Sequence, residues 1–208
     1  MALKLAKLAN MRKDAVHNRE RLLGAARRLF ADRGLDVPLD EIARAAGVSI
    51  GTLYNRFPTR DALVEAVFAD RVATVAGLAE QALAMGDAWE GFAAFMTGVC
   101  ELQASDLGYN DLAARAVAMD GDRGYGLMRE ILERAQRAGQ LRGDVTLADM
   151  AFVVWGVAAT IRATYEVAPG AWRRHLALTL DGLRAVAARP LPVPPMSVAK
   201  TRAAMREC

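Results

Sequence analysis

The N-terminal part of the chain contains the sequence Leu39-Asp-Glu-Ile-Ala-Arg-Ala-Ala-Gly-Val-Ser-Ile-Gly-Thr-Leu-Tyr-Asn-Arg-Phe57. Its pattern predicts two short helices, over about 39–46 and 50–56, with a break between them. Gly47 can adopt the positive φ of a tight turn, and Ser49 can accept a hydrogen bond from the first turn of the second helix. Three apolar residues supply a small core between the helices: Ile42, Val48 and Leu53. This anatomy predicts a helix-turn-helix.

Positive charge is concentrated at the same end of the chain. Residues 1–60 hold twelve Lys or Arg and six Asp or Glu, whereas residues 61–208 hold fifteen and eighteen. A basic module followed by a mildly acidic, more apolar remainder indicates that the first part meets a polyanion and the second has another task. A helix-turn-helix meets DNA with its second helix in the major groove and the preceding helix across the backbone.

The rest of the chain also predicts helices. Alternating β-branched segments with tight turns are missing from the sequence, while Ala, Leu, Arg and Glu dominate nearly every window. We therefore expect an all-α fold of about nine helices. They are expected at about 18–33, 39–46, 50–56, 60–84, 88–104, 108–119, 124–138, 146–166 and 171–188.

The residues around the motif are similar to a known family over about fifty positions. They comprise the Leu-x-x-Ala-Ala-x-x-Leu-Phe-x-x-x-Gly pattern of residues 22–34, then Ile42-Ala43, Ala46-Gly47-Val48, Gly51-Thr52-Leu53-Tyr54, Phe57-Pro58 and Arg60-Asp61-Ala62-Leu63. From Arg21 to Phe68 the chain resembles the N-terminal domain of the TetR family of bacterial transcriptional repressors. The resemblance implies a helical C-terminal domain for dimerisation and ligand binding, without implying the ligand.

Four segments follow from the helix pattern and the resemblance together. Residues 1–17 form a basic N-terminal extension, and residues 18–58 form the helix-turn-helix DNA-binding domain. Residues 59–188 form the ligand-binding and dimerisation domain. Residues 189–208 are expected to be a mobile tail, because residues from Pro190 onward hold four of the seven prolines.

The resemblance implies DNA contacts for several side chains. Tyr54 resembles the recognition-helix tyrosine that reaches a phosphate, and Thr52 and the amide of Gly51 resemble its neighbours at the DNA. Arg60 stands where a lysine is often found, and either side chain could meet a phosphate. Packing, capping and solvated surface charge are the alternative roles. The expected DNA-binding residues are Arg44, Ser49, Ile50, Gly51, Thr52, Tyr54, Asn55, Arg56 and Arg60, of which Ile50, Asn55 and Arg56 suit base edges or phosphates by their chemistry.

Two apolar segments near the C-terminus predict a dimer interface. Residues 150–161 are apolar all round except Thr160, which indicates one side buried in its own domain and another in a partner. The next helix is amphipathic, and two helices from each subunit would form a four-helix interface. The expected interface residues are Val154, Ala158, Ile161, Trp172, Leu176, Leu180 and Leu183; the core of a monomer is the alternative.

A ligand cavity is expected between the fifth and eighth helices. Its expected lining is Phe95, Met96, Val99, Met119, Met128, Phe152 and Trp155. Such a stripe is also typical of plain core, which is the alternative for each residue. A small, apolar or amphipathic inducer would suit this lining. Cys100 in the same apolar helix fits inert packing better than redox sensing.

Other function classes are less compatible with the sequence. The longest uncharged apolar run, residues 151–161, holds eleven residues, fewer than the roughly 20 that span a bilayer. The first ten residues lack a secretory pattern, and two cysteines fit a reduced, cytoplasmic protein without a membrane partner. Two histidines cannot readily supply a catalytic or metal site, so we expect neither an enzyme nor a cofactor. The competing class is a protein-interaction adaptor of the same shape that acts mainly through a partner protein.

Overall fold

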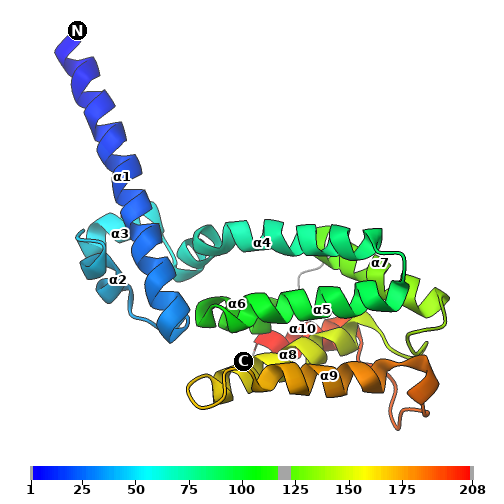
Figure 1. Ribbon diagram of the computed structural model, residues 1–208. Coiled ribbons are helices and arrows are strands. Elements are labelled where there is room, and N and C mark those ends of the chain that lie inside the picture. The colour runs from blue at the N-terminus through cyan, green and yellow to red at the C-terminus, as the bar shows by residue number, and fades with distance from the viewer. Residues whose placement is uncertain (1, 117–122, 207–208) are drawn as a thin grey trace. The chain divides into compact units, whose positions relative to one another are not determined.

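The computed structural model describes residues 2–116 and 123–206 and is helical throughout these ranges apart from turns and loops (Figure 1). The elements are α1 (Ala2–Arg33), α2 (Leu39–Ala45), α3 (Ile50–Arg56), α4 (Arg60–Ala84), α5 (Ala88–Ala104), α6 (Leu107–Ala116), α7 (Arg123–Arg137), α8 (Leu147–Thr164), α9 (Ala171–Leu183), the 3₁₀ helix η1 (Ala185–Ala187) and α10 (Val198–Arg206). The predicted all-α fold is confirmed. The chain forms two compact units, Met1–Asp70 and Arg71–Cys208, and the boundary falls within α4.

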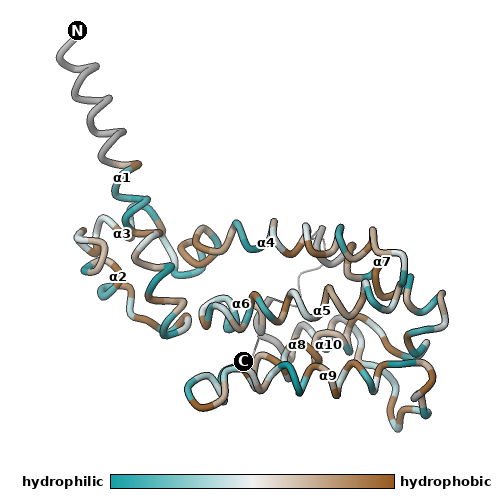
Figure 2. Tube along the Cα trace, viewed as in Figure 1, coloured by the Kyte–Doolittle hydropathy of each residue, from teal (hydrophilic) through white to brown (hydrophobic). Residues whose placement is uncertain are grey.

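Unit 1 is built around the side of α1 that carries Leu22 and Phe30. Both side chains are fully buried, together with Ile42 of α2 and Leu53 of α3. The first turns of α4 close this core, since the ring of Phe68 lies 6.3 Å from that of Phe30. In Figure 2 the coloured part of α1 is mostly hydrophilic, so this single apolar stripe anchors the helix.

Unit 2 is a bundle whose core is centred on α5. The residues buried in this core include Phe92, Phe95 and Met96 of α5, Ile131 of α7, Met150 and Val157 of α8, and Trp172 and Leu176 of α9. Helix α8 packs against α5, α6 and α9. It is also long and apolar enough to cross a membrane by length and composition alone, yet 39% of it is buried inside the structure. One such helix is weak evidence for a membrane span.

The corner between α4 and α5 is held by close packing and by one arginine. A Cβ atom at Gly91 would collide with the carbonyl oxygen of Ala82, so only glycine lets the two helices approach this closely. The guanidinium of Arg134 on α7 donates to the carbonyls of Ala82 at 3.3 Å and Leu83 at 3.2 Å. These bonds satisfy carbonyls that the end of a helix leaves unpaired.

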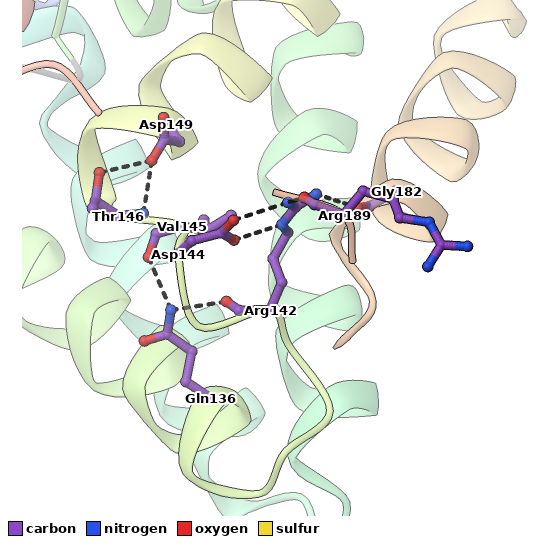
Figure 3. Close-up of polar contacts among 8 residues, drawn as sticks. All are labelled: Gln136, Arg142, Asp144, Val145, Thr146, Asp149, Gly182 and Arg189. Atoms are coloured by element: carbon purple, nitrogen blue, oxygen red, sulfur yellow. Dashed lines mark hydrogen bonds and ion pairs between the residues drawn. The ribbon is translucent and has the colours of Figure 1, made fainter. Parts of the chain in front are cut away.

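A second arginine connects the α7–α8 loop to the end of α9 (Figure 3). Arg142 donates to both carboxylate oxygens of Asp144, at 2.7 and 3.0 Å, and to the carbonyl of Gly182 at 3.3 Å. These hydrogen bonds from Arg142 hold the pKa of Asp144 below its ordinary value. Beside this network, the side chain of Gln136 donates to the carbonyl of Val145 at 2.9 Å. The polar groups of the loop are thereby satisfied inside the bundle.

The structure differs from the predicted segments at both ends of the chain. Helix α1 begins at Ala2, so the extension predicted over 1–17 continues the helix that was expected to start near residue 18. The tail predicted as mobile contains α10, in which Thr201 is buried and which packs against α6 and α8. This helix was not predicted because the proline-rich character of residues 190–195 was extended to the residues that follow them. Its first turn is supported by Ser197, whose carbonyl accepts from the Thr201 amide at 3.0 Å.

Candidate nucleic-acid interface

The turn between α2 and α3 has the geometry expected of a helix-turn-helix. Gly47 adopts φ +64°, and the amide of Val48 donates to the carbonyl of Ala43 at 3.0 Å. Ser49 is the N-cap of α3, since its Oγ accepts from the Thr52 amide at 3.1 Å. Each of these features fixes the direction in which α3 leaves the turn.

One face of α3 anchors the helix and the other is open to solvent. Leu53 is fully buried, whereas Ile50 is 41% exposed and Tyr54 is 50% exposed. Asn55 and Arg56 are also exposed, and Thr52 is half-buried beneath its bond to Ser49. The side of α3 opposite Leu53 is therefore accessible to a partner.

On α2, Arg44 extends from the exposed side. Its guanidinium lies 3.1 Å from the carboxylate of Asp40, one turn earlier, and both side chains are largely exposed. Such an ion pair contributes little to stability and can open. The guanidinium of Arg44 is therefore exposed to solvent and paired with a carboxylate on its own helix.

Arg60 has a structural role that the sequence did not reveal. Its Nη1 donates to the carbonyl oxygens of Leu35 at 2.6 Å and Val37 at 2.9 Å. Arg60 thereby connects the start of α4 to the loop that leads into α2. Arg21 acts similarly on the turn, since its Nη2 donates to the carbonyl of Gly47 at 3.3 Å. One sequence carries no signal for such bonds, because both partners are backbone carbonyls distant along the chain.

The residues predicted to line a ligand cavity are divided between core and surface. Phe95 and Met96 are buried in the core of unit 2, with Val99 and Met128 packed against it. Phe152 is exposed and Trp155 half-buried, with their rings 6.3 Å apart. Met119 lies outside the described residues. Cys100 is buried, and this burial raises the pKa of its thiol to about 12, in agreement with inert packing.

A groove of about 380 Å³ lies elsewhere in unit 2. It is lined by α7, the first turn of α8 and the segment before α10, including Arg129, Gln136, Leu147 and Met196. None of the residues predicted to line the ligand cavity is among its lining residues. The sequence offered no signal for this groove, since part of its wall, Met196 and Ser197, belongs to the segment predicted to be a mobile tail.

Most residues predicted for the dimer interface are buried within their own chain. Six of the seven, Val154, Ala158, Ile161, Trp172, Leu176 and Leu183, belong to the buried core, and Leu180 is half-buried against it. In contrast to the prediction, these side chains are covered by their own chain. On the opposite side of α9, Leu178 is 62% exposed.

Comparisons with known proteins cover both units. A family model described as bacterial regulatory proteins of the tetR family matches residues 22–67. A second model, described as the C-terminal domain of SbtR-like transcriptional regulators, matches residues 86–185. The first match contains the whole helix-turn-helix, and the second contains α5 to α9.

Individual relatives agree with the family models. The transcriptional regulator UidR of Escherichia coli K12 is 36% identical over 59 residues, which are 28% of this chain and 30% of UidR. The TetR transcriptional regulator SCO0520 of Streptomyces coelicolor is 36% identical over 80% of this chain and 98% of its own, with a TM-score of 0.49. FadR of Bacillus subtilis, solved with stearoyl-CoA, is 16% identical over 82% of this chain and 99% of its own, with a TM-score of 0.59, and shares the fold.

The family follows from matches in both units. Together the two family models match residues 22–67 and 86–185, which are most of the chain. The chain belongs to the TetR family of bacterial transcriptional regulators.

Proposed function

We propose that the protein is a ligand-responsive transcriptional repressor that binds a pseudo-palindromic operator as a homodimer. The observation that carries this proposal is the division of α3 into a buried face, at Leu53, and an exposed face, at Ile50 and Tyr54. A recognition helix needs this division, because one face must fix it on the domain while the other enters the major groove.

The exposed residues divide into two chemical classes. Ile50 and Asn55 can read bases, since an aliphatic side chain suits a thymine methyl and an amide suits an adenine edge. Tyr54, Arg44 and Arg56 suit phosphates, which position the protein without carrying sequence information. Thr52 and the Gly51 amide complete the contact surface, and Ser49 holds the first turn of α3. Arg60 is proposed to have two roles: it donates to the carbonyls of Leu35 and Val37, and it also contacts a phosphate.

Dimerisation is proposed through the outer side of α8 and α9. Phe152 is 37% exposed, and Leu178 is 62% exposed on the neighbouring helix. The hydroxyl of Thr160 on α8 and Nδ1 of His175 on α9 lie 2.6 Å apart, and this hydrogen bond connects the two helices. A second copy would cover these apolar side chains, and a two-fold axis would present two recognition helices to symmetric half-sites.

The inducer is proposed to bind unit 2 and to act through α4. This helix begins at Arg60 in unit 1 and ends at Ala84 in unit 2. A ligand releases DNA only if it binds the two head arrangements with different affinity. A coupling of about 1–3 kcal/mol would weaken operator binding by roughly 5- to 150-fold. FadR of Bacillus subtilis, which shares the fold, was solved in complex with stearoyl-CoA, and this supports a ligand with an apolar part.

Footprinting on the intergenic DNA next to the gene tests the proposal. We expect the footprint to show protection of two symmetric half-sites. The protein itself is expected to be cytoplasmic and to repress the adjacent promoter. A competition with unrelated duplex at several salt concentrations separates specific from electrostatic binding. Protection that is independent of sequence and lost with moderate salt would contradict the repressor and favour the adaptor that acts through a partner protein.

A further inference from the structure

The side chain of Gln103 is a polar group without a partner in the core of unit 2. It lies in the last turn of α5, and its exposed fraction is 0%. Neither its Nε2 nor its Oε1 has a hydrogen-bond partner among the residues that the structure describes. Buried amides are almost always hydrogen-bonded, because leaving both groups unpaired costs free energy that folding does not recover elsewhere.

Two more buried groups with unused hydrogen-bonding capacity lie on α6 and α9, which both pack against α5. Asn110 on α6 donates from Nδ2 to the carbonyl of Ala158 at 3.2 Å, but its Oδ1 is unpaired. The indole Nε1 of Trp172, at the start of α9, is buried and unpaired as well. The start of α9 lies beside the end of α5 (Figure 1), since Arg173 and Glu101 form an ion pair at 3.5 Å. We call Gln103, Asn110 and Trp172 the polar cluster.

The chemistry of the polar cluster favours a neutral partner. Its unused groups are two donors, Gln103 Nε2 and Trp172 Nε1, and two acceptors, Gln103 Oε1 and Asn110 Oδ1. None of them carries charge. The carboxylates near these residues along the chain are already paired: Glu101 lies 3.5 Å from Arg173, Asp106 lies 3.7 Å from Arg71, and Asp111 lies 3.8 Å from Arg162. An ion brought beside neutral groups in an apolar core would not be compensated.

We propose that the polar cluster recognises a small, largely apolar molecule through a neutral hydroxyl group, such as that of a phenol or an alcohol. A hydroxyl is both donor and acceptor, so it can accept from Gln103 Nε2 or Trp172 Nε1 and donate to Gln103 Oε1 or Asn110 Oδ1. Met96 lies two turns earlier in α5 and is buried in the same core; its unbranched side chain can repack around a small guest. The inference deepens the proposed function by naming the class of inducer.

A matched pair of probes tests this assignment. Phenol and fluorobenzene are similar in size, but only phenol has a hydroxyl. Each is titrated into the ¹⁵N-labelled full chain while the indole N–H signal of Trp172, assigned with Trp172→Phe, is followed. We expect phenol to bind at least about tenfold more tightly and to shift this signal. Equal affinity, or binding that leaves the signal unchanged, would overturn the proposal.

Variants at Gln103 identify the group responsible. In Gln103→Leu, and in the unbranched Gln103→Met, the preference for phenol is expected to fall to about that of fluorobenzene, while the ligand-free melting temperature rises by several degrees because an unpaired amide is removed. Gln81→Leu, which removes an exposed amide on α4, is the control and is expected to keep the preference. If both Gln103 variants keep it, or both melt lower than the wild type, the amide is satisfied in another way and the proposal fails.

The experiment separates this inference from the proposed function. Probe binding is measured without DNA, and operator binding is measured separately. Phenol binding that depends on Gln103 but leaves operator affinity unchanged would support the polar cluster and contradict the inducer mechanism. Operator release by another ligand, with no phenol preference in the wild type, would leave the repressor intact and overturn the polar cluster as its ligand site.

Discussion

Replacing Arg60 by alanine separates structural support from DNA contact. In the structure its Nη1 donates to two carbonyl oxygens, those of Leu35 at 2.6 Å and Val37 at 2.9 Å, in the loop before α2. A hydrogen bond from a charged donor contributes about 1.5–3 kcal/mol. Because one nitrogen makes both bonds and the side chain is only half-buried, we take the lower part of that range. Arg60→Ala is therefore expected to destabilise the protein by about 1.5–2 kcal/mol.

Urea denaturation followed by circular dichroism measures this loss, and Arg60→Lys should recover part of it. Arg56→Ala is the control, since Arg56 lies exposed at the end of α3. Its free energy of unfolding should change by less than about 0.5 kcal/mol, whereas its operator affinity should fall. An Arg60→Ala variant as stable as the wild type, but unable to bind DNA, would refute the structural role and show that Arg60 acts on phosphate alone.

Tyr54→Phe should weaken binding to the operator and to unrelated duplex by a similar factor of about 5- to 10-fold, because a phosphate contact carries no sequence information. Fluorescence anisotropy measures both affinities, and a loss confined to the operator would contradict this prediction. Leu178→Glu should give a folded monomer in sedimentation, and a stable dimer of this variant would show that the interface lies elsewhere. Leu176→Glu should instead lower the free energy of unfolding by about 3 kcal/mol or more, because it buries a charge in the chain's own core. The hydrogen bonds from Arg142 lower the pKa of Asp144, so the stabilisation is present above the ordinary aspartate pKa and is lost as pH falls below about 4. Urea midpoints between pH 3 and 7 should show a weaker acid dependence in Asp144→Asn, and an unchanged dependence would contradict the assignment.

Local signals located the helices, because their ends are determined by neighbouring residues. Helices α4 and α5 begin and end as predicted. Thr59 Oγ1 accepts from the Ala62 amide at 3.1 Å, and Asp87 Oδ1 accepts from the Glu90 amide at 2.9 Å. Both caps are readable from the sequence. The helix-turn-helix was predictable for the same reason, since Gly47 and Ser49 act within one turn.

Contacts between distant elements were not predictable. Apolar spacing on α9 identified Trp172 and Leu176 as buried, but it could not say whether the cover comes from the same chain or from a second copy. In the structure the same chain covers them, and Leu178 is left exposed. The bonds of Arg60 to the α1–α2 loop were missed because backbone acceptors have no sequence signature. The unpaired amide of Gln103 is likewise visible only when its neighbours are known.

A selection from randomised duplex DNA tests the central claim most directly, because it asks whether the exposed face of α3 reads bases. The wild type should select two-fold symmetric half-sites whose centres are separated by about one helical turn of DNA or by a whole number of turns. The double variant Ile50→Arg with Asn55→Ala should select a different half-site of the same symmetry. An unchanged base preference in that variant, or no enriched sequence for the wild type, would contradict the account.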